Sequence, residues 1–301
     1  MDKNPAVIIA GHGQMGHAME ALLAGQARLH IWPIAPDDLE VPAAIRIAAA
    51  EAAFLLVCTP TVAHAAVLEP LARLLAADAA VLSIAKGLDE SGRTAADILQ
   101  AYRGGHPWGV LGGPMIANEI IAGRKAFAEL GGDRGLFARA VELFPAERLW
   151  LSHTSNARAV SWCGVLKNIY APLIGVADGL GWGDNVRGHL IMAATAEMTR
   201  LLPVLAGDGG SAYGDAGLAD FVTTVTSASS HHYSLGRRIA RGDYAALECE
   251  GVHSLRVLQA ARRLGSRAYP LYAVAASLAR DPAALVPALQ AWLAAHAAPA
   301  V

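Results

Sequence analysis

The chain has 301 residues, enough for two domains of ordinary size, each with its own core. Its 24 Lys and Arg against 26 Asp and Glu leave no basic field that would attract nucleic acid or an anionic membrane. Hydrophobic residues make up 54% of the sequence, but charged residues or a proline interrupt the longest apolar stretches before they reach the length of a spanning helix. We therefore expect a protein that works on a small molecule, with neither nucleic acid nor membrane as a partner.

The N-terminal sequence and the spacing of cysteines and histidines indicate no secretion and no metal site. Residues 1–5 show no basic region followed by an apolar signal core, so we expect the protein in the cytoplasm. The three cysteines are far apart and odd in number, which is typical of reduced thiols. Even the adjacent His231 and His232 lack a companion His or Cys at helical spacing, so we expect no metal ion.

The first half of the chain alternates short apolar runs with helical patterns, which is the order of βαβ units. Such continuous apolar strands are typical of a parallel sheet buried on both faces. Helices are expected through Met19 and Leu22 and over residues 137–143. Strands are expected at residues 7–10, 29–32, 53–58, 80–84 and 108–111, in a run that begins at residue 126, and at residues 148–151.

The polar run of residues 152–156 indicates a domain boundary, because the pattern changes after it. Long helical periodicity covers residues 157–202 and 215–297, without a convincing strand. The expected fold class is α/β: an N-terminal Rossmann-like parallel-sheet domain over residues 1–153, followed by an all-α C-terminal domain over residues 154–301.

A glycine hexad, GHGQMG at residues 11–16, follows the first expected strand and opens the first helix. In a dinucleotide-binding turn, Gly11 permits the tight turn, Gly13 lets the backbone approach a pyrophosphate, and Gly16 allows close packing of helix on strand. The phosphates would meet free backbone N–H groups at the N-terminus of the helix. A purely structural turn is the alternative interpretation. The expected cofactor site comprises Gly11, Gly13, Gln14, Met15 and Gly16.

The choice between NAD and NADP stays open. An acidic residue at the end of the second strand would bind the ribose hydroxyls of NAD, and an arginine there would bind the 2′-phosphate of NADP. That strand ends at Trp32 with neither residue, and the nearest carboxylates are Asp37 and Asp38 in the following loop. We therefore expect either NAD or NADP as the cofactor.

A lysine and an asparagine interrupt an otherwise apolar helical stretch at residues 163–171. A buried ammonium group must be paired or face a polar cleft, so Lys167 and Asn168 indicate such a cleft. The polar, glycine-containing run at residues 178–185 follows closely and supports it. Alternatively, the Lys167 side chain extends along the helix to the surface.

Further motifs follow in order along the chain. They are Lys86-Gly87-Leu88, Gly113-Pro114 with Ala117 and Glu119, Leu166-Lys167-Asn168, Asp178-Gly179 with Asn185, Glu197-Met198, AGLAD at residues 216–220, and Glu250-Gly251. Together with the hexad, this order resembles the bacterial NAD(P)-dependent glycerol-3-phosphate dehydrogenases nearly from end to end. The order is far more specific than any single motif.

The resemblance implies a catalytic group. Lys167 would give a proton to the carbonyl oxygen as hydride arrives and would remove it in the reverse direction. Such a lysine works best when burial and neighbours lower its pKa toward neutrality. Asp220 and Thr224 match positions that hold the substrate hydroxyl end and the lysine. The expected catalytic residues are Lys167, Asn168 and Asp220.

The same resemblance implies the binding residues. Lys86 matches a contact to the substrate phosphate, and Ala117 and Glu250 match cofactor contacts. The expected substrate-binding residues are Lys86, Gly113, Met115, Thr224, Ser230, His231 and His232. The expected cofactor site adds Lys86, Ala117 and Glu250 to the residues of the glycine hexad.

Three departures from the family pattern concern the substrate. Where the family has Ser-Arg-Asn to hold the substrate phosphate, this chain has Ser230, His231 and His232. The fixed bidentate cation is gone and histidine is only partly charged at neutral pH, so phosphate affinity should fall unless another group substitutes. Met115 replaces a small hydroxyl residue, and Ala219 replaces a glycine. A pair of solvated loop histidines is the alternative interpretation of His231 and His232.

Three functions are consistent with these observations. The first is hydride transfer between NAD(P) and a small hydroxy or keto substrate, by resemblance sn-glycerol 3-phosphate and dihydroxyacetone phosphate, with Lys167 as general acid and base. The second is a related dehydrogenase for a different hydroxyketone or 2-hydroxy acid, including an unphosphorylated one. The third is a dinucleotide-binding module without catalysis, against which the polar set around Lys167 argues. Large apolar helical surfaces also suggest a homodimer, and the resemblance suggests a place in glycerophospholipid metabolism.

Overall fold

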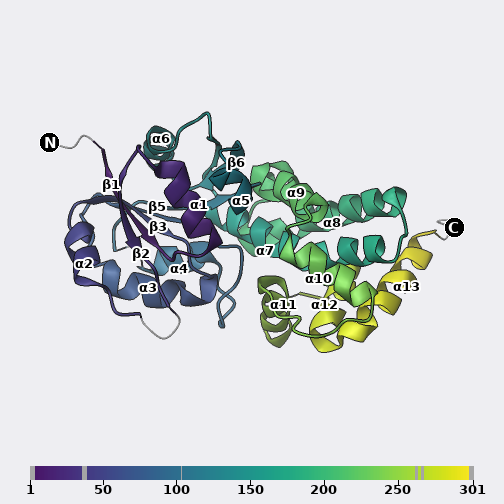
Figure 1. Ribbon diagram of the computed structural model, residues 1–301. Helices are drawn as coiled ribbons and strands as arrows, with labels where there is room; N and C mark the ends of the chain where they lie inside the picture. The colour runs from purple at the N-terminus through teal and green to yellow at the C-terminus, as the bar shows by residue number, and fades with distance from the viewer. Residues whose placement is uncertain (1–3, 36–38, 103, 262–263, 266–267, 298–301) are drawn as a thin grey trace.

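A seven-stranded sheet organises the N-terminal half of the protein (Figure 1). The computed structural model describes residues 4–35, 39–102, 104–261, 264–265 and 268–297. The strands are β1 (Ala6–Ala10), β2 (Arg28–Trp32), β3 (Ala52–Val57), β4 (Ala80–Ser83), β5 (Trp108–Gly112), β6 (Ala126–Gly131) and β7 (Leu149–Thr154). Every strand expected from the sequence is present.

The strand order places a crevice at the carboxyl ends of the strands, next to the glycine turn that follows β1. The order is β2-β1-β3-β4-β5-β6-β7, and all neighbouring pairs are parallel except β5 and β6. β1 has β2 on one side and β3 on the other, so the chain connections leave the β1 region in opposite directions. In open α/β sheets, ligands bind at such a switch point, outside the carboxyl ends of the strands.

The antiparallel step between β5 and β6 corrects the expectation of a parallel sheet. The chain leaves β5 at the carboxyl edge and forms the short helix α5 (Ala117–Ile121), which packs against α1 (Gln14–Leu23). It then enters β6 from the same edge, without crossing back over a face of the sheet. β6 therefore runs opposite to β5, and β7 runs parallel to β6.

β7 extends further than the sequence indicates. Ser152, His153 and Thr154 belong to the polar run expected to mark the domain boundary, and they pair in register with residues 129–131 of β6, so the strand continues into that run. β7 lies at the edge of the sheet, where one side of a strand is free to carry polar groups. The Ser152 hydroxyl donates a hydrogen bond to Asp215 (Oγ–Oδ2 2.7 Å).

Alternating side chains of the strands enter two cores, one on each face of the sheet. Ile8 and Ala10 of β1 belong to one core and Val7 and Ile9 to the other, as the period of two in a strand requires. Helices α1 and α6 cover the second core, and α2, α3 and α4 cover the first (Figure 1). Their bounds are α2 (Ala43–Ala49), α3 (His64–Leu71), α4 (Ala95–Tyr102) and α6 (Arg134–Leu143).

The C-terminal half of the described chain is helical, as expected, and is built around α7 (Ala157–Gly179). Asn156 caps this helix, since its side-chain oxygen accepts a hydrogen bond from the N–H of Ala159 (3.0 Å). Among the described residues, α7 alone is long and apolar enough to cross a membrane, but its whole apolar window is buried inside the protein. α7 is therefore the core helix of this half.

The remaining helices surround or extend this core (Figure 1). α7 also packs against β5 and β6, so Val110 of β5 and Val160 of α7 share one hydrophobic core. The longer helices are α8 (Asp184–Ala206), α9 (Asp220–Thr226), α10 (His231–Ala240), α11 (Glu250–Ala260), α12 (Pro270–Arg280) and α13 (Leu285–Ala297). Short turns are η1 (Thr61–Ala63), η2 (Gly210–Tyr213), the π-helical η3 (Asp215–Ala219) and η4 (Pro282–Ala284).

Candidate active site

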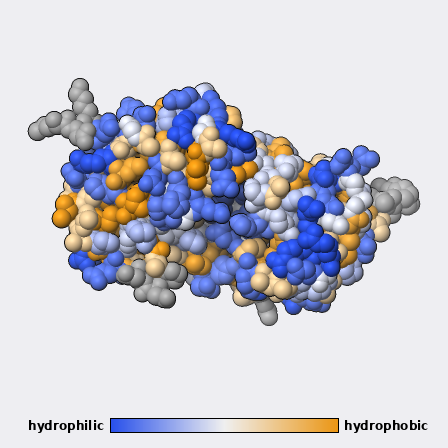
Figure 2. Space-filling model, in the orientation of Figure 1, coloured by the Kyte–Doolittle hydropathy of each residue, from blue (hydrophilic) through white to orange (hydrophobic). Residues whose placement is uncertain are grey.

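A cavity of about 330 Å³ lies between the carboxyl edge of the sheet and the helical half. The space-filling view shows a hollow with hydrophilic surface between these two parts (Figure 2). The cavity gathers most of the residues expected from the sequence. These are Gln14, Met15, Lys86, Met115, Ala117, Lys167, Asn168, Asp220, Thr224, Ser230, His231, His232 and Glu250.

The glycine turn has the geometry that a dinucleotide needs. Gly11 has a φ of +93°, which L side chains rarely adopt. A Cβ atom at Gly16 would lie 2.2 Å from the carbonyl oxygen of Gly11, so only glycine lets α1 pack this closely. A Cβ at Gly13 would meet no protein atom within 4 Å, and Gly13 lines a second cavity that adjoins the first through Lys86 and Gln14. The turn therefore has room for a pyrophosphate at the N-terminus of α1.

Directly after β2, residues 33–35 of the described chain offer no side chain that selects between the two dinucleotides. β2 ends at Trp32, which is buried and whose carbonyl oxygen accepts the Gly11 N–H (2.9 Å). The next residues, 33–35, include neither an acid nor an arginine. Asp37 and Asp38 lie outside the described residues.

Lys167 lies in the middle of α7, and its ammonium group donates two hydrogen bonds to polar side chains. Its Nζ donates to Asp220 (Oδ1, 2.8 Å) and to Thr224 (Oγ1, 2.7 Å). Asp220 opens α9 and Thr224 lies four residues later, so both project from one face of that helix. Lys167 is 6% exposed, so the interpretation that its side chain reaches the surface is wrong.

Lys86 is the second ammonium group of the site. Its Nζ donates to the other carboxylate oxygen of Asp220 (2.7 Å) and to the carbonyl oxygen of Gly113 (3.0 Å). Asp220 therefore bridges two lysines. The Asn168 side chain donates to the carbonyl oxygen of Lys86 (Nδ2–O 3.0 Å), so it holds the Lys86 backbone against α7.

Burial and neighbouring charges bring the pKa of Lys167 closer to neutral pH. Burial lowers the pKa of Lys167 from 10.5 to about 8, Asp220 opposes this by stabilising the ammonium, and Lys86 lowers the pKa further by repulsion. A group with such a pKa can both give and take a proton near pH 8. The expectation of a lysine tuned by burial and neighbours is confirmed.

The histidine pair lies in the first turn of α10, at the wall of the cavity. Ser230 caps this helix by accepting the N–H of Tyr233 (3.3 Å), and His231 is exposed at the cavity. The Nε2 of His232 accepts the backbone N–H of Gly251 (3.2 Å). Burial, with repulsion from Lys167, lowers the pKa of His232 to about 3. The interpretation as loop residues is therefore wrong for both histidines, since both lie in α10. That of a solvated side chain is wrong for His232, which is neutral rather than partly charged at pH 7.

Glu250 and Met115 also line the cavity. Glu250 opens α11 and lines both cavities, and its carboxylate lies against Gly87, where an added Cβ would be 3.3 Å from Oε1. Burial raises the pKa of Glu250, while Lys86 and Lys167 oppose the rise. Met115 is buried and presents an apolar side chain to the cavity.

Five residues of the cavity wall are not among those expected from the sequence. Two of them, Ser227 and Ser229, belong to the hydroxyl-rich run SASS at residues 227–230. This run directly precedes the histidine pair, so the sequence contained a signal for them. The other three lie next to expected residues in the sequence. The five are Ile116, Asn118, Thr223, Ser227 and Ser229.

A glycine turn on one wall of a cavity and a buried lysine–aspartate pair on the other define a dinucleotide-dependent dehydrogenase. Models of the NAD-dependent glycerol-3-phosphate dehydrogenase N-terminus and C-terminus match residues 14–130 and 156–282. A glycerol-3-phosphate dehydrogenase [NAD(P)+] from Gloeobacter violaceus is 33% identical over 267 residues, which cover 84% of this chain and 85% of that protein. The chain belongs to the NAD(P)-dependent glycerol-3-phosphate dehydrogenase family.

A second relative agrees with this assignment, and a solved structure shares the fold. A glycerol-3-phosphate dehydrogenase [NAD(P)+] from Agrobacterium fabrum is 28% identical over 284 residues, covering 86% of this chain and 87% of that protein. The crystal structure of a glycerol-3-phosphate dehydrogenase from Coxiella burnetii has the same fold, with a TM-score of 0.83 at 24% identity over 96% of this chain and 99% of that one.

Proposed function

We propose that the protein interconverts sn-glycerol 3-phosphate and dihydroxyacetone phosphate with NAD or NADP, and that Lys167 is its general acid and base. The observation that carries the proposal is the buried group of Lys167, Asp220 and Thr224, whose lysine has a pKa of about 8 and faces the cavity beside the glycine turn. Membership of the family supports the choice of substrate.

The lysines have one donor each left for ligands. An ammonium group has three N–H donors, and Lys167 uses two of them on Asp220 and Thr224. The third is free to donate to the carbonyl oxygen of the substrate and to transfer its proton there during reduction. In the oxidation, the neutral amine takes the proton from the hydroxyl. NAD(P) supplies or accepts the hydride at the neighbouring carbon.

Lys86 is the cation that we assign to the substrate phosphate. Two of its three donors go to Asp220 and Gly113, which leaves one for a phosphate oxygen. His231, at the arginine position of the family, lacks the fixed charge and the bidentate donors of a guanidinium. His232, at the asparagine position, is neutral and already accepts a hydrogen bond. Ser227 and Ser229 line the same cavity, and their hydroxyl groups can donate to the phosphate.

A second candidate is a related dehydrogenase for an unphosphorylated hydroxyketone or a 2-hydroxy acid, because a neutral His232 gives less attraction for phosphate. Rates of NADH and NADPH oxidation with dihydroxyacetone phosphate and with dihydroxyacetone separate the two. We expect kcat/KM to be at least about tenfold higher for the phosphate ester, which corresponds to about 1.4 kcal/mol. A preference for the unphosphorylated ketone would support the second candidate. Tight NADH binding without turnover of any ketone would support a non-catalytic binding module.

The substrate site offers a gain-of-function variant. Replacing His231→Arg and His232→Asn together restores the residues that the family carries at these positions. A guanidinium adds a fixed positive charge and several donors, so KM for dihydroxyacetone phosphate should fall while KM for dihydroxyacetone stays unchanged. Steady-state kinetics with both ketones measures the difference.

We also propose that the protein is a cytoplasmic homodimer with domains at residues 1–153 and 154–301, serving glycerophospholipid metabolism without a nucleic acid or membrane partner. The even charge balance supports a small-molecule partner. Phe127 and Trp150 pair across β6 and β7 and are 41% and 53% exposed, which supports contact with a second copy. Light scattering after size exclusion should give the dimer mass, and a monomer at micromolar concentration would contradict the homodimer.

A further inference from the structure

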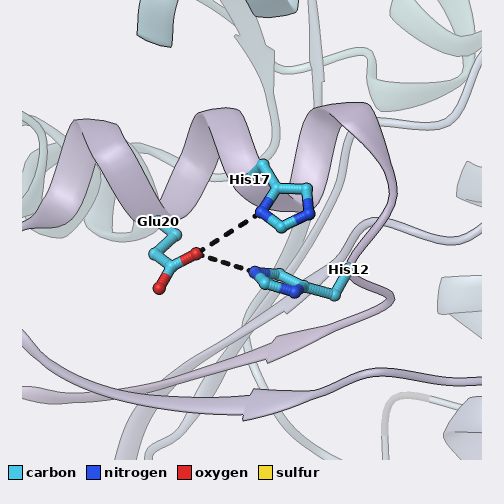
Figure 3. Close-up of side chains that lie close together, drawn as sticks. All are labelled: His12, His17 and Glu20. Carbon is cyan, nitrogen blue, oxygen red and sulfur yellow. Dashed lines mark hydrogen bonds and ion pairs between the residues drawn. The ribbon is translucent and has the colours of Figure 1, made fainter.

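Two histidines and a glutamate that the dehydrogenase chemistry does not use lie together beside the glycine turn (Figure 3). His12 belongs to the turn itself, and His17 and Glu20 are one helical turn apart on α1. Oε2 of Glu20 is 2.7 Å from Nε2 of His12 and 3.7 Å from Nδ1 of His17. One candidate ligand atom from each of the three residues lies within 4.8 Å of the other two.

We propose that His12, His17 and Glu20 bind a divalent cation of the zinc class, such as Zn²⁺ or Co²⁺. Two imidazole nitrogens and one carboxylate oxygen are ligands that these ions prefer, and the same set of donors holds zinc in sites that keep a fourth position for water. Mg²⁺ and Ca²⁺ prefer oxygen ligands and do not suit this set.

The distances suit a tetrahedral ion. Bonds of about 2.1 Å in tetrahedral geometry place ligand atoms about 3.4 Å apart. The two contacts of Glu20, at 2.7 and 3.7 Å, lie on either side of that value. The ligand nitrogens of His12 and His17 also lie within 4.8 Å of each other, so all three separations are near the value that the ion needs.

The protonation of the cluster is compatible with metal binding. In the metal-bound form, Nε2 of His12 and Nδ1 of His17 would bind the ion through their lone pairs. Each neutral ring would then carry its proton on the other nitrogen. The ion replaces the hydrogen bond between His12 and Glu20. The two rings are close, with centroids 3.8 Å apart at an angle of 48°, so one ion can reach both of them.

The cluster is open to solvent and separate from the catalytic group. The side chains of His12, His17 and Glu20 are 20%, 55% and 43% exposed, so an ion can enter from water and keep a water ligand. None of the three residues lines the cavity that contains Lys167. The inference therefore stands independently of the proposed function. The sequence pattern did not suggest it, because the first histidine lies in a loop and the third ligand is a carboxylate.

The test is metal binding by the full-length chain after treatment with a chelator. Isothermal titration with Zn²⁺ should give one ion per chain, and Co²⁺ should give the visible absorption of a tetrahedral nitrogen–oxygen site. In His17→Ala and in Glu20→Gln, binding should weaken by at least about tenfold. Both variants alter exposed side chains on α1 and leave the glycine turn unchanged, and circular dichroism checks that they fold.

His253→Ala is the matched control. His253 lies 4.0 Å from a carboxylate oxygen of Glu90, which makes a histidine–glutamate pair. This pair is not part of a three-ligand cluster, since the cluster found among the described residues is His12, His17 and Glu20. His253→Ala should therefore bind Zn²⁺ as the unaltered chain does. Equal Zn²⁺ affinity in His17→Ala and the unaltered chain, or displacement of Zn²⁺ by equimolar Mg²⁺, would overturn the proposal.

Discussion

At the scale of single residues, the Lys167 ammonium is balanced between burial, which lowers its pKa, and Asp220, which raises it. Asp220 also holds Lys86, so the same carboxylate neutralises two cations of the cavity. The balance matters for catalysis because a lysine with its ordinary pKa would be a poor base near neutral pH. The proposed acid–base chemistry therefore depends on the charges of Lys167, Asp220 and Lys86 together, and not on Lys167 alone.

The first prediction concerns the pH dependence of kcat/KM. Reduction needs the ammonium form of Lys167, so its rate should fall as the pH rises through about 8, and oxidation needs the amine, so its rate should rise over the same range. Asp220→Asn removes the interaction that raises the pKa of Lys167, so both profiles should move to lower pH. Profiles of Asp220→Asn that coincide with those of the unaltered enzyme would show that another group titrates.

Sequence patterns located the residues that line the cavity better than the bonds between them. Lys167 was recognisable because a charged residue interrupts an apolar helix. The bond between Lys86 and Asp220 joins residues 134 positions apart, and no local pattern reports such a contact. The neutrality of His232 depends on its burial and on the N–H of Gly251, both of which exist only after α10 and α11 have packed.

At the scale of elements, Gly13 and Gly16 of the glycine turn lie three residues apart and are glycines for different reasons. Gly16 is needed for packing inside the protein, because a Cβ there would overlap the carbonyl oxygen of Gly11. Gly13 has open space around its Cα and a backbone conformation, φ −76° and ψ −162°, that other residues adopt. The protein fold therefore requires Gly16 but not Gly13, for which we propose a role in dinucleotide binding.

The second prediction compares alanine at these two glycines. Gly16→Ala should lower the free energy of unfolding by about 1–3 kcal/mol, because α1 must move away from β1. Gly13→Ala should cost only a few tenths of a kcal/mol at the start of the helix, yet weaken NADH binding by about tenfold or more. Chemical denaturation and NADH fluorescence titration measure the two effects. Equal loss of stability in both variants would contradict the separation.

A buried carboxylate on α8 organises α12. Glu197 is 4% exposed and accepts the backbone N–H groups of Leu271 (2.7 Å) and Tyr272 (2.8 Å) and the hydroxyl of Tyr170 (2.8 Å). These N–H groups are in the first turn of α12, where a negative charge also interacts favourably with the helix dipole. The glutamate therefore connects α7, α8 and α12.

The third prediction is that Glu197→Ala destabilises the fold. It leaves three buried donors without an acceptor, which should cost roughly 3 kcal/mol or more. Glu69→Ala on the exposed side of α3 is the control and should change the free energy of unfolding by no more than about 0.5 kcal/mol. Urea denaturation compares the two, and a similar small effect of both substitutions would refute the structural role of Glu197.

At the scale of the whole molecule, the two halves share a core rather than only a cavity. α7 packs on β5 and β6, and a Cβ at Gly131 of β6 would lie 2.5 Å from the Cα of Ala157. The sequence predicted the order of strands and helices because each has its own periodicity. It did not predict the antiparallel β5–β6 step or the length of β7, because both depend on how β6 and α5 pack after the chain has left β5.

The fourth prediction is a single unfolding transition for both halves. Because hydrophobic side chains of the sheet and of α7 belong to one contiguous core, the loss of either half exposes apolar surface of the other. Differential scanning calorimetry should show one peak that shifts as a whole when NADH is added. Two peaks, of which NADH moves only one, would show that the halves unfold independently.

The most direct test of the proposed function is reduction of dihydroxyacetone phosphate by the unaltered enzyme and by Lys167→Met. Methionine fills the space of the aliphatic part of the lysine side chain, one heavy atom shorter, and Asp220 keeps Lys86 as its partner, so the variant should fold. We predict that kcat/KM falls by about 10²–10⁴ in Lys167→Met while the Kd for NADH is unchanged. Full activity of Lys167→Met, at equal NADH affinity, would contradict the account.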